Sequence, residues 1–284
     1  MLTHRAGVVG SPVEHSLSPV LHRAAYDALG LTGWAYDAHR IGGEGELDLP
    51  TFVEGLGRDW VGLSVTMPNK EAALRLAVAA TERAQRVGAA NTLVRREDGW
   101  VADNTDPEGV LGALSEAGCV AARRALVFGA GATARSALDA LARLGVRDVV
   151  FAVRETVRPQ TASLAERCGM RHDVVRLSDA TSIVQIAGGV DVVVATLPAG
   201  SGVGEGYGQA DLSGVVLLDA VYANWPTHLA RWAADQGATV VSGAEMLLHQ
   251  AAGQVELMTG RTAPLPAMRA ALTAALRADT PTPR

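Results

Sequence analysis

Apolar runs with the length and composition of strands alternate along the chain with stretches whose apolar positions recur at helical spacing. Strands are predicted over 5–10, 60–66, 125–129, 148–153, 190–195, 214–220 and 239–241. Helices are predicted over 19–29, 107–117, 132–144, 162–167, 227–234, 243–258 and 266–277. Such alternation is typical of α/β proteins with parallel sheets. We take the spans between these elements in the first part of the chain as loops.

Two helix starts carry a local signature. Ser18-Pro19 and Asp106-Pro107 each offer a capping side chain followed by a proline at the first helical position. Gly30 and Gly118 then end the two helices. Because a side chain at a helix N-terminus can also face a ligand, both Ser18 and Asp106 stay open to a functional interpretation.

The pattern divides the chain into two domains. The length of 284 residues exceeds the ~100–200 residues of a usual domain. We expect a first domain over 1–105, a nucleotide-binding domain over 106–242, and helices over 243–284 that return to the first domain. The last residues, 278–284, are expected to lack regular structure.

Composition excludes several classes of function. Hydrophobic residues make up 48% of the chain and charged residues 19%, which favours a folded globular protein. A net charge of -5 provides no basic field for nucleic acid or anionic lipid. No apolar run approaches the ~18 residues that span a bilayer, and no export signal is visible. The two cysteines predict no disulfide framework, so we expect a cytoplasmic protein; the histidine spacing predicts no metal site.

Lys70 is unusual because it is the only lysine among 25 basic side chains. Arginine serves wherever a permanent charge is enough, whereas an ammonium can lose its proton when desolvated. Lys70 is therefore a candidate proton donor. The alternative is that this lysine occurs by chance on a solvent-exposed helix and has no function.

A glycine-rich turn follows the predicted strand 125–129 and opens the next helix. Its sequence is Gly129-Ala-Gly131-Ala-Thr-Ala134. The first glycine allows a tight turn, the second lets the backbone approach a diphosphate, and Ala134 permits close packing of helix on strand. The backbone N–H groups at the helix start then hold the phosphates. This context predicts a dinucleotide site.

The residues after the next strand bear on the choice of cofactor. An arginine there accommodates the extra phosphate of NADP, whereas an acid favours NAD. Arg154 and Arg158 favour NADP, and Glu155 between them leaves NAD possible.

Three further polar clusters lie outside the nucleotide-binding pattern. They are Ser16-Leu-Ser18-Pro19, Ser64-Val-Thr66-Met-Pro-Asn-Lys70, and Asn91-Thr92 together with Asp103-Asn-Thr-Asp106. With Gly10-Ser-Pro-Val-Glu-His before the first cluster, Gly88-Ala-Ala before Asn91, and Gly243-Ala-Glu-Met246-Leu-Leu-His-Gln250-Ala, the ordered set resembles the shikimate dehydrogenase family. The likeness covers nearly the whole chain. It implies an N-terminal α/β substrate-binding domain completed by C-terminal helices, and a Rossmann-like domain between them.

The resemblance also implies an activity and residue roles. Members of the family reduce 3-dehydroshikimate to shikimate with NADPH, in the biosynthesis of chorismate and aromatic amino acids. By position, Ser16, Ser18 and Tyr222 would bind the substrate carboxylate, and Thr66, Lys70, Asn91, Asp106 and Gln250 the ring hydroxyls, with Lys70 and Asp106 as the catalytic pair. The cofactor-binding residues would be Gly129, Ala130, Gly131, Ala132, Thr133, Ala134, Arg154, Arg158, Gly243 and Met246.

Two departures from the family pattern keep alternatives open. Ser64 stands where many members have asparagine, and Val153-Arg154-Glu155 stands where an Asn-Arg-Thr phosphate clamp is common. An NAD-preferring quinate or shikimate dehydrogenase is therefore one rival, and a non-catalytic dinucleotide-sensing module is another. We expect a small-molecule substrate, no nucleic-acid or membrane partner, and a monomer or homodimer.

Overall fold

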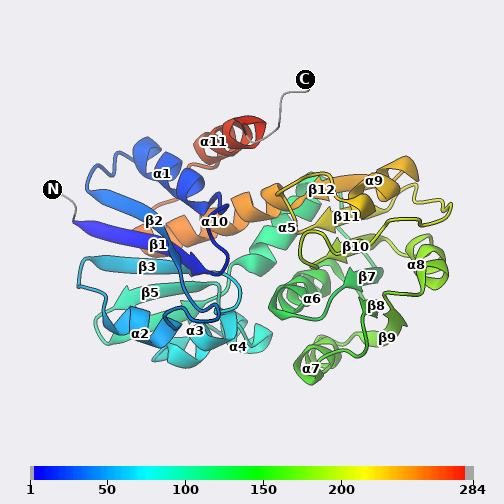
Figure 1. Cartoon of the computed structure of the whole chain (residues 1–284), viewed down its shortest axis with the longest axis horizontal. Helices are drawn as coiled ribbons and strands as arrows, with labels where there is room; N and C mark the ends of the chain where they lie inside the picture. Colours follow the sequence, from blue (N-terminus) through cyan, green and yellow to red (C-terminus); the bar gives the residue numbers. More distant parts are fainter. Residues whose placement is uncertain (1–2, 279–284) are drawn as a thin grey trace. The chain divides into compact units, whose positions relative to one another are not determined.

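The structure is a computed structural model that describes residues 3–278, divided into two units (Figure 1). Unit 1 contains the chain up to Thr105 and again from Leu247, and unit 2 contains Asp106–Met246. The boundary near Leu247 lies inside one helix, α10 (Gly243–Thr259). Of the tail predicted to lack regular structure, Ala278 ends a helix, and residues 279–284 lie outside the described residues.

Unit 1 is a six-stranded mixed sheet with helices on both faces. The strands are β1 (His4–Gly10), β2 (Trp34–Arg40), β3 (Trp60–Val65), β4 (Ala79–Ala80), β5 (Thr92–Arg96) and β6 (Gly99–Asp103), in the order β2-β1-β3-β5-β6-β4. The helices are α1 (Ser18–Ala28), α2 (Leu49–Glu54), α3 (Lys70–Leu76), α4 (Glu82–Val87), α11 (Leu265–Ala278) and most of α10. In Figure 1, α1 and α10 lie over one face of this sheet, and α2 and α3 over the other.

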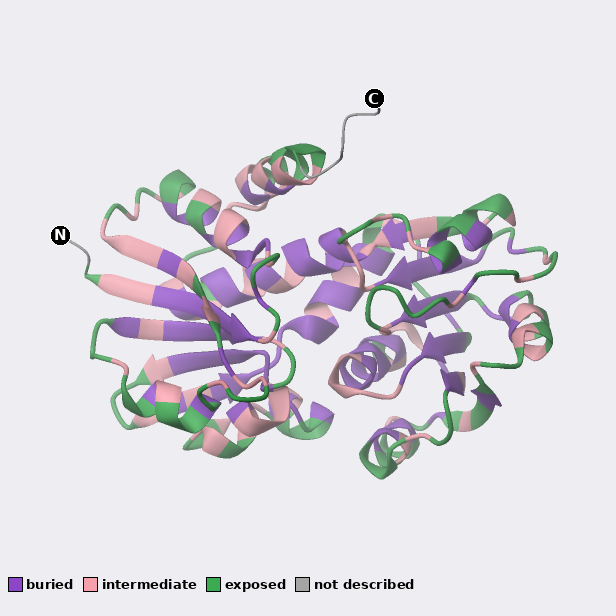
Figure 2. Ribbon diagram, viewed as in Figure 1, coloured by how far each residue is buried: buried purple, intermediate pink, exposed green. Residues whose placement is uncertain are grey.

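Alternation along the strands separates two apolar layers. Val9, Leu63 and Val65 belong to the layer that packs against α2 and α3. Ala6 and Val8 belong to the opposite layer, with side chains from α1, β2 and α10. Because the sheet is buried on both sides, its centre is closed to water (Figure 2).

The prediction of loops in this part of the chain is wrong, because the structure forms β2, β4, β5, β6, α2, α3 and α4 there. The prediction of parallel sheets is only partly right for this unit, whose sheet is mixed. β5 and β6 form an antiparallel hairpin, turned at Gly99 with φ of +135°, and β5 also runs antiparallel to β3. These strands carry Arg95, Arg96 and Asp103, so they lack the continuous apolar run of a parallel central strand.

Unit 2 is an all-parallel sheet. Its strands are β7 (Arg124–Phe128), β8 (Asp148–Val153), β9 (Arg171–Arg176), β10 (Val192–Ala195), β11 (Val216–Asp219) and β12 (Thr239–Ser242). Its helices are α5 (Asp106–Glu116), α6 (Ala132–Leu144), α7 (Pro159–Arg167), α8 (Ala180–Ala187) and α9 (His228–Asp235). Only β9 and α8 among these elements were not predicted; β9 is a mostly polar edge strand, so it gives no strong apolar pattern.

The strand order in unit 2 is β12-β11-β10-β7-β8-β9. Counted along the unit, this is the order 6-5-4-1-2-3, the arrangement of doubly wound dinucleotide-binding folds. Chain order reverses between β7 and β10. In such sheets a ligand binds outside the carboxyl ends of the strands at this reversal. The glycine-rich turn follows β7, so the sequence places it at that position.

Candidate functional site

The predicted substrate-binding residues of unit 1 lie on separate elements. Ser18 begins α1, two residues after Ser16, whose Oγ accepts a hydrogen bond from the Ser18 backbone N–H at 3.3 Å. The predicted N-cap role of Ser18 is wrong, since Leu17 is the cap residue and no side chain caps α1. Asp106 is likewise the first residue of α5 rather than its cap. Helix capping therefore does not explain the Ser18 side chain.

Thr66 follows β3 at the edge where β1 also ends. Its backbone N–H donates to the Val9 carbonyl oxygen at 2.9 Å. A Cβ atom at Gly10, the last residue of β1, would lie 2.2 Å from Thr66 Cγ2. Only glycine therefore fits at position 10, and the close approach of the two strand ends fixes where Thr66 lies.

Lys70 begins α3 after a tightly bonded turn. The Asn69 backbone N–H donates to the Thr66 carbonyl at 2.9 Å, and the buried Asn69 amide donates to the Ile41 carbonyl at 2.7 Å. The Lys70 carbonyl in turn accepts from the Ala90 N–H at 2.8 Å. These three hydrogen bonds fix the backbone of Asn69 and Lys70. Lys70 is half-buried, and its long side chain extends from the first turn of α3.

Asn91 forms hydrogen bonds through both the nitrogen and the oxygen of its amide and is 1% exposed. Its Nδ2 donates to Gln250 Oε1 at 2.8 Å and to Thr105 Oγ1 at 2.9 Å. Its Oδ1 accepts from the Thr105 backbone N–H at 2.8 Å and from Thr92 Oγ1 at 2.7 Å. The structure thus brings together Asn91 and Gln250, two predicted ligands of one substrate that lie far apart in the sequence.

The segment that leads to Asp106 is held by a partly buried ion pair. The Asp103 carboxylate accepts from Arg83 Nη2 at 2.8 Å and from Thr81 Oγ1 at 2.7 Å. It also accepts the Asn104 backbone N–H at 2.7 Å, and the Asn104 amide donates to the Ala89 carbonyl. Asp106 itself is 2% exposed and is the first residue of unit 2.

Tyr36, Ser64 and Gln254 form a second buried polar group in unit 1. Tyr36 Oη donates to Ser64 Oγ at 2.6 Å, and Ser64 Oγ donates to Gln254 Oε1 at 2.8 Å. Burial raises the pKa of the Tyr36 phenol. Tyr36 and Gln254 were not predicted as site residues. The available signal for Gln254 was its position one turn after Gln250 on the same helix.

The glycine-rich turn of unit 2 has the shape that a dinucleotide requires. Gly129 has φ of +98°, and a Cβ there would lie 2.7 Å from Thr196 Oγ1, on the residue that follows β10. A Cβ at Gly131 would meet no atom within 4 Å, so the space over this turn is open. Gly131 is also the N-cap of α6, and no side chain caps that helix. Open space and uncapped N–H groups fit a diphosphate at this position.

The second half of the predicted cofactor site is partly exposed. Arg154 and Arg158 are both exposed, in the segment between β8 and α7. The buried Thr161 on α7 donates through Oγ1 to the Ala130 carbonyl at 2.8 Å. Thr161 therefore ties the arginine-bearing segment to the glycine-rich turn, a positioning role that no local sequence pattern indicated.

The remaining predicted cofactor residues begin α10. Gly243 lies so close to β11 that a Cβ there would be 2.1 Å from the Ala220 carbonyl oxygen. Met246 is buried in an apolar cluster of unit 2 that includes Leu218 and Val241. Tyr222, the predicted carboxylate partner, is half-buried in the segment after β11.

A cavity of about 250 Å³ lies in unit 2, among the segments that follow β10 and β11. Its lining includes the buried Asp219, whose carboxylate accepts from Thr227 Oγ1 at 2.7 Å and from the Val221 N–H at 3.1 Å. Burial raises the pKa of the Asp219 carboxyl, and the two hydrogen bonds oppose that shift. The carboxylate thereby holds the segment that contains Tyr222.

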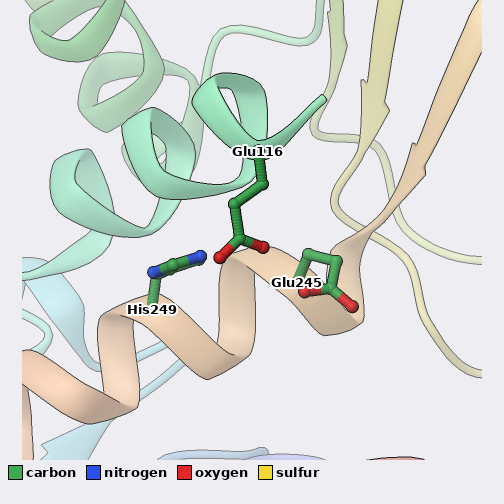
Figure 3. Close-up of side chains that lie close together, drawn as sticks. All are labelled: Glu116, Glu245 and His249. Atoms are coloured by element: carbon green, nitrogen blue, oxygen red, sulfur yellow. The ribbon is translucent and has the colours of Figure 1, made fainter. Parts of the chain in front are cut away.

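Side chains suited to a cation occur on α5 and α10 (Figure 3). In unit 2, ligand oxygens of Glu116 and Glu245 lie within 4.8 Å of each other. His249 stands one turn after Glu245 on α10, with a ring nitrogen within the same distance of it. Carboxylates near a helix end are common without a metal, and we assign none.

The fold and these residues define a class. A doubly wound parallel sheet with an open glycine-rich turn at its order reversal belongs to a dinucleotide-binding enzyme. Unit 1 adds a second α/β unit in which the side chains of Asn91, Thr105 and Gln250 are joined by hydrogen bonds.

Comparison with known proteins identifies the particular family. Residues 8–93 match the shikimate dehydrogenase substrate binding domain, and residues 243–273 the shikimate 5'-dehydrogenase C-terminal domain. A curated shikimate dehydrogenase (NADP(+)) from Thermosynechococcus vestitus is 34% identical, over 96% of each chain. The chain belongs to the shikimate dehydrogenase family.

Solved structures agree with this assignment. The crystal structure of Mycobacterium tuberculosis shikimate dehydrogenase is 46% identical, covers 95% of this chain and 99% of its own, and has a TM-score of 0.84. The shikimate 5-dehydrogenase of Thermus thermophilus, in complex with NADP(H) and shikimate, is 31% identical, covers 97% and 100%, and has a TM-score of 0.79. The predicted family and fold class are confirmed, and with them the class of enzyme, an oxidoreductase.

Membrane insertion was not expected. Among residues 3–278, the structure contains no helix with the length and apolar character needed to cross a bilayer.

Proposed function

We propose that this protein catalyses the reversible NADP-dependent reduction of 3-dehydroshikimate to shikimate. The observation that carries the proposal is the hydrogen bond between Asn91 and Gln250 in unit 1. The resemblance assigned both residues to the ring hydroxyls of one substrate, and their amides meet although they lie on separate elements. The names of the relatives, which are NADP(+) enzymes or bind shikimate, support the same activity.

The residues proposed to bind the substrate carboxylate and ring hydroxyls lie in unit 1, and those proposed to bind the cofactor phosphates lie in unit 2. In unit 1, Ser16 and Ser18 offer hydroxyl groups to the substrate carboxylate, and Thr66, Asn91 and Gln250 offer partners to the ring hydroxyls. In unit 2, the open turn from Gly129 to Ala134 would hold the diphosphate of the cofactor. Arg154 and Arg158 provide two positive charges for the phosphate that distinguishes NADP from NAD.

Reduction of the ring ketone needs one hydride on carbon and one proton on oxygen. When bound, the nicotinamide supplies the hydride. Lys70 supplies the proton. Its ammonium donates a hydrogen bond to the ketone oxygen and stabilises the negative charge that develops there. It then transfers one proton to that oxygen, which forms the O–H bond of the product hydroxyl. Asp106 accepts a hydrogen bond from the neighbouring hydroxyl and orients Lys70. In the reverse direction Lys70 takes the proton back.

A turnover assay that crosses both cofactors with both polyols tests the activity. Shikimate and quinate are each supplied with NADP and with NAD, and the nicotinamide absorbance is followed. The highest kcat/KM is expected for shikimate with NADP. A higher value with NAD and quinate would establish the rival dehydrogenase, and binding of dinucleotide without turnover of either polyol would establish a sensing module.

Variants of Lys70 test the proton transfer. Lys70→Ala and Lys70→Arg are both expected to lose roughly 10²–10⁴-fold in kcat with little change in KM. Arg75→Ala, on the exposed side of the same helix α3, is the matched control and should retain the wild-type rate. Near-normal turnover of Lys70→Arg would mean that a fixed charge is enough and that the proton comes from another group.

We also propose a cytoplasmic location. The support for it is that Cys119 and Cys168 are both thiols, as expected in a reducing compartment.

A further inference from the structure

The segment 11–17 connects β1 to α1 without forming a helix or a strand, and it contains Ser16. The proposed function gives the Ser16 hydroxyl a role in binding the substrate carboxylate. Ser16 Oγ accepts from the Ser18 backbone N–H at 3.3 Å, which leaves the hydroxyl its own hydrogen to donate to a carboxylate. Because regular secondary structure does not hold this segment, side-chain contacts must determine where Ser16 lies.

Glu46 holds the start of segment 11–17. It lies in the loop 41–48 between β2 and α2. Its Oε1 accepts from Ser11 Oγ at 3.0 Å, and its Oε2 accepts from the Gly43 backbone N–H at 2.8 Å. A Cβ at Gly43 would lie 2.6 Å from Ser11 Oγ, so the loop and the segment are in close contact. The Glu46 side chain is only 17% exposed, although the next residue, Leu47, is exposed.

Arg40 extends this network to the middle of the segment. Its Nε donates to Glu46 Oε1, the oxygen that also accepts from Ser11. Its Nη1 donates to Glu14 Oε1 at 3.0 Å. Glu14 Oε2 in turn accepts from the Val13 backbone N–H at 3.0 Å. One guanidinium therefore links a carboxylate of the loop to a carboxylate of the segment.

A turn connects Glu14 to Ser16. The Ser16 backbone N–H donates to the Val13 carbonyl at 3.0 Å, which closes a turn of four residues that contains Glu14. The contact of Glu14 with Arg40 therefore fixes the turn that ends at Ser16, while Ser11 fixes the start of the segment. Both contacts depend on the loop that carries Glu46.

We propose that Glu46 is a positioning residue for substrate binding, because it holds segment 11–17 in the conformation that presents the Ser16 hydroxyl to the substrate carboxylate. Groups that are ordered before the ligand arrives reduce the entropy lost on binding. The inference rests on the proposed function, since the order of this segment affects binding only if the substrate carboxylate lies at Ser16.

The charge of Glu46 gives the proposal a definite sign. The hydrogen bond from Arg40 lowers the pKa of the Glu46 carboxyl, which is therefore ionised at neutral pH. The substrate is an anion, so removal of a nearby negative charge would by itself lower its KM. In Glu46→Gln the amide offers one accepting oxygen and cannot serve the donors on both sides of the carboxylate. Loss of those bonds loosens the segment and raises KM, so the direction of the change separates positioning from electrostatics.

Glu46→Gln is expected to raise the KM for shikimate about 2–10-fold, the effect of losing one hydrogen bond to a charged group. The kcat value and the KM for NADP should stay within about twofold of wild type, because Glu46 touches no reacting atom in this account. Calorimetry with shikimate should show the same fold-change in Kd. Ser11→Ala removes one of the same bonds without a change of charge, and it should also raise the KM for shikimate.

Glu44→Gln is the matched control. Glu44 is an exposed residue of the same loop, two positions before Glu46, and it takes no part in the hydrogen bonds of Glu46. Its substitution removes the same charge, so the KM for shikimate should be no higher than in the wild type. An equal rise in both glutamate variants would overturn the proposal. An unchanged or lower KM in Glu46→Gln would overturn it too, as would a fall in kcat at constant KM.

A double-mutant cycle with Ser16→Ala shows whether Glu46 acts through Ser16. If it does, Glu46→Gln raises the KM for shikimate in the wild-type background and changes it by less than about twofold in the Ser16→Ala background. Equal effects in both backgrounds would refute action through Ser16. Thermal denaturation of all four proteins verifies that each is folded.

The outcome is separable from that of the proposed function. A wild type that turns over shikimate, together with an unchanged KM in Glu46→Gln, would refute only the positioning role. A wild-type protein that neither turns over shikimate nor binds it in calorimetry would refute both.

Discussion

His22 is a buried imidazole whose protonation should destabilise the protein. It lies on α1 at 0% exposure, stacked on Tyr36, with Nε2 at 3.4 Å from Gln254 Oε1. Burial lowers the pKa of His22 to about 3, and the Gln254 hydrogen bond opposes this only in part. In the unfolded chain the imidazole titrates near its ordinary pKa of ~6.5.

The sign of the effect follows from proton binding. Between pH 6.5 and pH 3 the unfolded chain binds a proton at His22 that the folded chain does not, so stability falls as the pH is lowered through this range. At about pH 5 the loss is roughly 2 kcal/mol, and below about pH 3 it approaches ~5 kcal/mol. Above the unfolded pKa the contribution disappears.

Urea unfolding at about pH 8 and at about pH 5, followed by circular dichroism, measures this effect. The wild type should lose roughly 2 kcal/mol more free energy of unfolding between the two conditions than His22→Gln does. His15→Gln replaces an exposed histidine of the same unit and should behave as the wild type does. An equal loss in wild type and His22→Gln would refute the reasoning.

Three further predictions concern the two candidate sites and one close contact. Arg154→Ala and Arg158→Ala should raise the KM for NADP about 5–50-fold and leave the KM for NAD unchanged, as measured by steady-state kinetics; equal effects on both cofactors would reassign these arginines. Ser18→Ala should mainly raise the KM for shikimate, and an unchanged KM would move the carboxylate site elsewhere. Gly243→Ala should lower the thermal midpoint by several degrees, because its Cβ would overlap the Ala220 carbonyl, whereas Gly208→Ala, where a Cβ meets no atom, should not.

Much of unit 2 could be predicted because its signals are local. Four of its six strands, β7, β8, β10 and β11, are apolar runs buried by helices on both faces, and the glycine-rich turn combines a tight bend with a helix start in six residues. Unit 1 was harder. In its β5–β6 hairpin, Arg95 donates to the Trp60 carbonyl oxygen and Asp103 forms an ion pair with Arg83. These partners lie on other segments, so the local sequence does not indicate them.

The candidate site shows the same division. The residues of the family motifs could be named from the sequence, because each motif is a short continuous stretch with a fixed spacing of its residues. Lys70, for instance, follows Thr66 by four positions and needs no distant information. Their roles as substrate ligands and as a catalytic pair stay predictions, as do the oligomeric state and the position of the domain boundaries.

The sequence alone determined the family, the α/β class, the place of the glycine-rich turn and the motif residues, because spacing and residue chemistry carry that information over a few positions. Tertiary structure decided the hydrogen bonds of Asn91 with Gln250, and those of Tyr36 with Ser64 and of Ser64 with Gln254. These bonds join residues distant in the chain. Their existence depends on strand register and on the face that α10 covers, and a register shift of one residue would turn every one of those strand side chains to the opposite face.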